Sequence, residues 1–88
     1  MFSDHDIALL KQSPYSILQI NHHDVAFHSE FTGHDWIIIS YYDASDCYIL
    51  HRHSRRYSYH RQKGKHRSLK DALVYIKGHE EWFIKHKM

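Results

Sequence analysis

The segment from residue 51 to residue 67, HRHSRRYSYHRQKGKHR, is rich in side chains that could do chemistry. It contains seven Arg or Lys, four His and two Tyr, and it has no acidic residue. Arginine and lysine bind phosphate oxygens, whereas histidine ligates metal ions and transfers protons. Three functional hypotheses therefore concern this segment: phosphate binding, metal binding and catalysis.

The first hypothesis is binding to nucleic-acid phosphates by bases that lie in connections between predicted elements. The helix that we predict to begin near Ser68 adds free backbone N–H groups. Stacking of nucleic-acid bases would contribute only if the tyrosines face outward. The alternative is a solvated edge strand whose charges block aggregation. The residues assigned to phosphate binding are Arg55, Arg56, Lys63, Lys65 and Arg67.

The second hypothesis is a metal site made of histidines. His51 and His53 are two residues apart, so on a strand they share a face, with about 6 to 7 Å between their Cα atoms. His60 on the neighbouring strand could complete a set of three imidazoles. No carboxylate is evident near them to orient the rings. We therefore predict no native metal and no other cofactor.

The third hypothesis is catalysis by a metal-independent ribonuclease. Such an enzyme needs a general acid or base and a cation that stabilises the phosphorane, and His51, His60 and Arg61 could supply these groups. Their spacing matches no recognised catalytic signature. The chain also has no glycine-rich phosphate loop, H-E-x-x-H motif or nucleophile elbow. We therefore expect a non-enzymatic binding domain.

Length and composition indicate one small folded domain that spans residues 1–88. Apolar residues make up 42% of the chain, and there are only three Gly and one Pro, which is typical of a globular protein. Cys47 is the single cysteine, which excludes an internal disulfide and fits a reducing compartment, so we predict a cytoplasmic protein. No apolar stretch approaches transmembrane length and no secretory signal is evident, so no membrane association is expected.

Charge is distributed unevenly along the chain. Residues 1–50 carry one base and seven acids, a net charge of −6, whereas residues 51–88 carry eleven bases and three acids, a net charge of +8. The basic half can bind RNA, DNA or an acidic protein, and the two halves of two copies could attract each other in a homodimer. Trp82 is the candidate interaction residue, because Trp82, Phe83 and Ile84 are consecutive and cannot all face the core.

Capping signals and periodicity predict the elements that position these residues. Ser3 and Asp6 have the spacing of a capping box, so we predict a short helix over residues 4–12. Ser68 and Asp71 repeat that spacing ahead of an apolar stripe and predict a long helix over 69–86. Between the helices, alternating apolar residues predict about five strands, joined by the turns NHHD, TGHD and DASD. The predicted fold is α+β, a meander of antiparallel strands with the long C-terminal helix packed on one face.

The hairpin between the fourth and fifth strands decides which way the candidate residues face. A loop of two or four residues pairs His51 with His60, whereas a loop of three or five residues shifts the pairing by one. The first register separates tyrosines from histidines and is preferred. We then expect the tyrosine face to pack beneath the helix and His51, His53 and His60 to line the open face. Arg52 and Arg61 would extend to the margin of the sheet.

Overall fold

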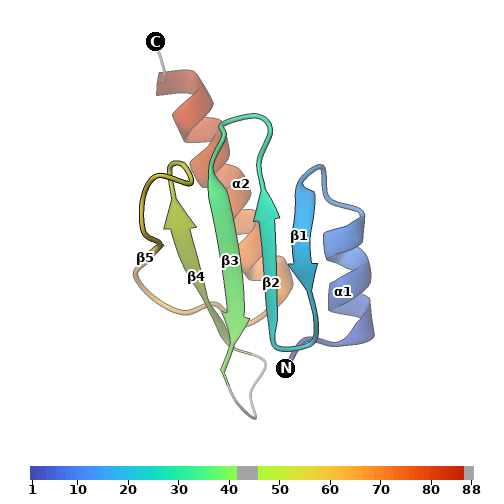
Figure 1. Cartoon of the computed structure of the whole chain (residues 1–88). Coiled ribbons are helices and arrows are strands. Elements are labelled where there is room, and N and C mark those ends of the chain that lie inside the picture. Colours follow the sequence, from blue (N-terminus) through green and yellow to red (C-terminus); the bar gives the residue numbers. More distant parts are fainter. Residues whose placement is uncertain (42–45, 87–88) are drawn as a thin grey trace.

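The computed structural model describes residues 1–41 and 46–86, which form two helices and five strands (Figure 1). The helices are α1 (Asp4–Lys11) and α2 (Leu69–His86), and the strands are β1 (Ser16–Ile20), β2 (Asp24–His28), β3 (Asp35–Ser40), β4 (Cys47–Arg52) and β5 (His60–Arg61). The strands lie side by side in sequence order, and each neighbouring pair is antiparallel. The predicted α+β meander is confirmed.

Both helices begin at the capping residues that the sequence predicted. Ser3 Oγ accepts a hydrogen bond from the backbone N–H of Asp6 at 3.1 Å, and the Asp6 carboxylate accepts one from the N–H of Ser3 at 2.9 Å. Ser68 Oγ accepts a bond from the N–H of Asp71 at 3.1 Å. These bonds satisfy donors that a helix leaves unpaired at its start. Neither helix has the length and hydrophobicity needed to cross a membrane.

The core lies between one face of the sheet and the helices. In Figure 1, α2 lies behind the sheet and α1 lies beside β1. Apolar side chains from α1, the sheet and α2 form one buried cluster, which includes Cys47. Its members are Phe2, Leu10, Val25, Phe27, Trp36, Ile38, Cys47, Ile49, Leu69, Ala72 and Ile76. One face of the sheet is therefore covered, and the other face is open to solvent.

Strand β3 occupies the centre of the sheet, as its apolar sequence predicted. Trp36 and Ile38 are buried on the covered face, whereas Ile37 and Ile39 are half-buried on the open face. The predicted TGHD turn ahead of β3 is present, and Gly33 adopts the left-handed conformation with φ of 81°. The DASD turn that was predicted after β3 falls largely on residues 43–45, which lie outside the described residues.

The predicted register of β4 and β5 is confirmed, but the predicted assignment of their faces is wrong. His51 pairs with His60, and Leu50 pairs with Arg61. His51 is only 5% exposed and lies on the covered face with Ile49. Tyr48 and Leu50 lie on the open face instead. The histidine side of β4 thus packs beneath the helix, and the tyrosine side faces solvent.

The arginines on the tyrosine side explain this orientation. Arg52 and Arg61 share their face with Tyr48, so covering that face would remove two guanidinium groups from water. An isolated buried charge is very costly, whereas an imidazole can be buried in its neutral form. On the open face, Arg52 Nε instead donates to Asp35 Oδ2 at 2.8 Å. The cost of burying arginine therefore outweighs the benefit of burying tyrosine.

The fifth strand is much shorter than the predicted YSYHRQ segment. β5 spans only His60–Arg61, because the chain first turns back on itself between Ser54 and Tyr57. The backbone N–H of Tyr57 donates to the carbonyl of Ser54 at 3.1 Å. A seven-residue connection, 53–59, therefore joins β4 to β5.

A pair of neighbouring substitutions tests the face assignment. We expect Ile49→Ala to lower the free energy of unfolding by about 2 to 5 kcal/mol, because it leaves a cavity in the core. Leu50→Ala should cost at least about 1 kcal/mol less, because Leu50 is half-buried on the open face. Urea denaturation measures both changes. An equal or larger loss for Leu50→Ala would mean that β4 faces the other way.

Candidate functional sites

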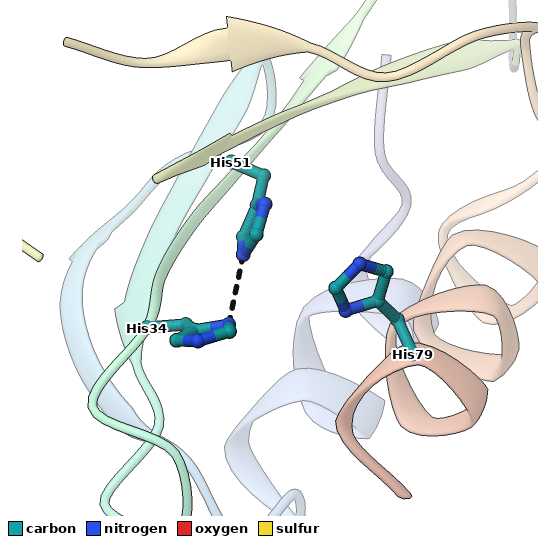
Figure 2. Close-up of side chains that lie close together, drawn as sticks. All are labelled: His34, His51 and His79. Carbon is teal, nitrogen blue, oxygen red and sulfur yellow. Dashed lines mark hydrogen bonds between the residues drawn. The ribbon is translucent and has the colours of Figure 1, made fainter. Parts of the chain in front are cut away.

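Three imidazoles from separate parts of the chain meet between the sheet and α2 (Figure 2). His34 directly precedes β3, His51 lies in β4, and His79 lies in α2. One ring nitrogen from each residue lies within 4.8 Å of those of the other two. His34 and His51 are buried, and His79 is half-buried. We call these three residues the histidine cluster.

A hydrogen bond joins two members of the histidine cluster. His51 Nε2 and His34 Nδ1 are 2.9 Å apart, so one ring donates and the other accepts. The accepting nitrogen must be unprotonated, and the two rings therefore cannot both be charged. The ring of His51 also stacks on the indole of Trp36, with 4.0 Å between ring centres. These contacts fix the orientation of His51.

Burial keeps the histidine cluster uncharged. It lowers the pKa of His51 to about 3, with further lowering from the neighbouring histidines. Burial also lowers the pKa of His34 and that of His79, because the charged imidazolium loses its hydration. All three rings are therefore neutral near pH 7.

Glu80 places a buried carboxylate beside the histidine cluster. Its Oε2 accepts a hydrogen bond from Thr32 Oγ1 at 2.7 Å and lies 3.8 Å from His34 Nδ1. Its Oε1 is buried and has no hydrogen-bond partner among the described residues, and the same holds for Nδ1 of His79. Most buried polar atoms in proteins are hydrogen-bonded. Five buried side-chain atoms of the described residues lack a partner, and three of them belong to Trp36, His79 and Glu80, in or beside the histidine cluster.

The other two histidines of the predicted metal set lie at the edge of this region. His53 is exposed, and its ring centre is 4.5 Å from that of His34 and 5.0 Å from that of His51. His60 is also exposed and lines a surface pocket with His53 and Tyr57. The structure thus groups His51 with residues that the sequence analysis did not select. Spacing could not have identified them, because they lie on different elements.

The three residues considered for catalysis are not gathered around one point. His51 and His60 are opposite each other on one face of the sheet, whereas the neighbouring Arg61 belongs to the other face. His51 is also buried, so a substrate phosphate has no direct access to it. The arrangement gives no support to a ribonuclease built from this set.

The open face carries tyrosine rings with cations placed over them. The guanidinium carbon of Arg61 lies 4.4 Å from the ring centre of Tyr48, and that of Arg52 lies 4.3 Å from the ring centre of Tyr59. Arg61 also donates a hydrogen bond to the hydroxyl of Tyr41. Such pairs hold the guanidinium groups over the aromatic rings. Aromatic and cationic groups are therefore interleaved on this face.

The five predicted phosphate-binding residues are all exposed. They lie in the loops 53–59 and 62–67, which precede and follow β5 in Figure 1. Lys65 Nζ is 3.8 Å from Asp46 Oδ2. The other four form no ion pair with residues 1–41 or 46–86. We call these two loops, together with the rings and arginines of the open face, the basic surface.

Trp82 and Ile84 are both exposed on α2, so two of the three consecutive apolar residues face outward. Trp82 is 59% exposed, and its ring stacks on that of His86 with 4.3 Å between centres. Phe83 instead turns inward and contacts the ring of His34 at a centre distance of 4.3 Å. The predicted outward side chain is thus present, and Trp82 is available to a partner.

The histidine cluster and the open face carry their side chains on opposite sides of β4. His51 and Arg52 are consecutive residues, so their side chains point to opposite faces. Variants of one site can therefore be chosen to leave the other site in place.

Comparison of the chain with known protein families, with curated proteins and with solved structures finds no match.

The lowered pKa of His51 predicts that the metal-free protein loses stability in acid. An unfolded histidine has a pKa of about 6.5, whereas that of folded His51 is about 3. Between these values only the unfolded chain binds the proton, so the free energy of unfolding falls as pH decreases through this range. The charged forms of His34, His79, His53 and His60 lie close enough to lower the pKa of His51 further.

The contribution of His51 can be measured by urea denaturation at several pH values in a chelating buffer. We expect His51→Gln to reduce the slope of stability against pH by up to about 1.4 kcal/mol per pH unit between pH 4 and 6. His5→Gln, which removes an exposed histidine, is the matched control. If His51→Gln left the slope unchanged, His51 would not be held neutral in the fold.

Proposed function

We propose that the protein binds single-stranded RNA or DNA through the basic surface, with little dependence on base sequence. The observation that carries the proposal is the outward position of Tyr48 and Tyr59, each with an arginine over its ring. Unpaired bases stack on aromatic rings and on guanidinium planes. Because an arginine already lies over each of these half-buried rings, a base would stack on the outer side of the guanidinium group. The open face therefore offers stacking groups and positive charge together.

Bases in the two loops supply the contacts to phosphate. Arg55 and Arg56 precede β5, and Lys63 and Arg67 follow it, so a bound strand could be held at both ends of this edge. A further pocket lined by Arg61 and Lys63 lies between the sheet and the second loop. Phosphate contacts of this kind are strong at low salt and carry no sequence information. The proposed compartment is the cytoplasm, where the single thiol would stay reduced.

Salt titration of binding to a single-stranded oligonucleotide tests this proposal. The logarithm of the association constant should fall linearly with the logarithm of salt concentration, by about 0.7 for each phosphate contact. Replacing both Arg55 and Arg56 by Ala should reduce the slope by about 1.4 and weaken binding to all sequences alike. The same change at Lys77 and Lys85 on α2 alters net charge equally and should leave the slope unchanged.

Four outcomes of these binding experiments distinguish the candidate functions. No binding at low salt would contradict the proposal, as would equal effects of the two double variants. A duplex of the same sequence should bind more weakly, because its paired bases cannot stack on the side chains of the open face. The RNA should be recovered intact, whereas cleavage that is lost in a His60→Ala variant would indicate a ribonuclease instead.

A second candidate function is interaction with an acidic protein or with another copy of the chain through α2. The exposed Trp82 favours it, since tryptophan is enriched at the centres of protein interfaces. The acidic first half of one copy could then meet the basic half of another.

Sedimentation measurements over a range of protein concentration test the homodimer. We expect a concentration-dependent dimer that Trp82→Ala weakens by at least about tenfold, because an interface tryptophan commonly contributes 2 kcal/mol or more. Val74→Ala, which shortens another exposed apolar residue of α2, is the matched control. A monomer at the highest concentration would contradict the homodimer.

A further inference from the structure

We propose that the histidine cluster binds one zinc-like transition-metal ion, with His34, His51 and His79 as ligands. The Glu80 carboxylate, which lies 3.8 Å from His34 Nδ1, would rotate to become the fourth ligand. This inference goes beyond the proposed nucleic-acid function and replaces the prediction that the chain has no metal. That prediction rested on His51, His53 and His60, which lie on one predicted hairpin. The ligands proposed here come from the loop before β3, from β4 and from α2.

One pair of donor atoms is spaced like two ligands of a tetrahedral site, and the third donor lies nearby. Zinc–nitrogen bonds are about 2.0 to 2.1 Å long, so two ligands at tetrahedral angles are about 3.3 Å apart. His51 Nε2 and His34 Nδ1 are 2.9 Å apart, and all three imidazole donors lie within 4.8 Å of one another. Small rotations of the side chains would bring the three rings around one ion. The hydrogen bond between His34 and His51 would then be replaced by two coordinate bonds.

The donor chemistry selects a particular class of ion. Three imidazole nitrogens and one carboxylate oxygen suit zinc, cobalt, nickel and copper, whereas magnesium and calcium prefer oxygen ligands. Ligation requires imidazole in its neutral form. The hydrogen bond between His51 and His34 already requires the accepting ring of that pair to be neutral.

Two unpartnered atoms give independent support for a ligand at this place. Nδ1 of His79 and Oε1 of Glu80 are buried, and neither has a hydrogen-bond partner in the described part of the chain. Glu80 is only 4% exposed, so water does not hydrate the carboxylate as a whole. A bound cation would neutralise this buried charge and satisfy its free oxygen.

The surroundings hold the proposed ligands in place and leave a route from solvent. Thr32 Oγ1 donates to Glu80 Oε2, and Trp36 stacks on the ring of His51. Such outer contacts orient ligands and raise metal affinity. His53 is exposed and lies against the ring of His34, next to the pocket that it lines with Tyr57 and His60. An ion could enter from that side.

Titration of the metal-free protein with zinc and with cobalt tests the proposal. Calorimetry should give one tight site per chain, and bound cobalt should show the intense visible absorption of tetrahedral coordination. His79→Gln should weaken zinc binding by at least about 100-fold, and Glu80→Gln by about 10- to 100-fold. The double variant His5→Gln with His23→Gln, which removes two exposed histidines distant in sequence from these ligands, should bind zinc as the native protein does.

These measurements also distinguish zinc bound at the histidine cluster from zinc bound non-specifically by other histidines. If a folded His79→Gln protein bound zinc as tightly as the native chain, the proposed ligand set would be wrong. If that variant did not fold, the cobalt spectrum of the native protein would decide, because an octahedral spectrum would exclude the buried tetrahedral site. Zinc should also raise the melting temperature of the native protein in a concentration-dependent way. No rise at saturating zinc would contradict a site that joins the sheet to α2.

Discussion

The packing of β4 against α2 determines where both candidate sites lie. His51 and Arg52 are consecutive in β4, so only one of them can lie beneath the helix. A guanidinium group keeps its charge at any pH that a folded protein tolerates, whereas an imidazole can become neutral when it is buried. Histidine is therefore the residue that enters the interior. Because the histidine side of β4 is buried, the arginines and the adjacent tyrosines face solvent.

On the open face of the sheet, a buried carboxylate holds the arginine side chain in its outward orientation. Asp35 in β3 lies opposite Arg52 in β4, and its carboxylate is hydrogen-bonded to both Arg52 and His28. Burial alone would raise the pKa of Asp35, but its two partners outweigh this effect and hold the pKa below its usual value. Asp35 therefore stays charged and keeps Arg52 on the open face. The same strands thus carry a neutral cluster inside and a cationic surface outside.

Local signals in the sequence predict the helices and strands, but they do not predict which face of the sheet is buried. Ser3 and Ser68 identify the helix starts, and alternation identifies the strands and the pairing of His51 with His60. Alternation defines two faces without saying which one the helix covers. The charges decide that question, because burying Arg52 and Arg61 would cost more than burying the neutral histidines.

The histidine cluster could not be found by spacing, because its members meet only after the sheet and α2 have packed together. One signal in the sequence did indicate it. Glu80 falls on the same helical stripe as Ala72 and Ile76, where an acidic side chain is unexpected. A charged residue on a core stripe usually has a partner or a ligand. The chain has eleven histidines, and the histidine cluster accounts for three of them.

The most direct test of this account is a measurement of proton–proton nuclear Overhauser effects to the ring of His51 in the protein in solution. The ring should give strong effects to the indole of Trp36 and to the ring of His79, whose ring centres lie 4.0 and 5.0 Å away. Tyr48 should give effects to the side chain of Arg61 and none to α2. Effects between Tyr48 and α2, with His51 close to neither Trp36 nor His79, would contradict the account.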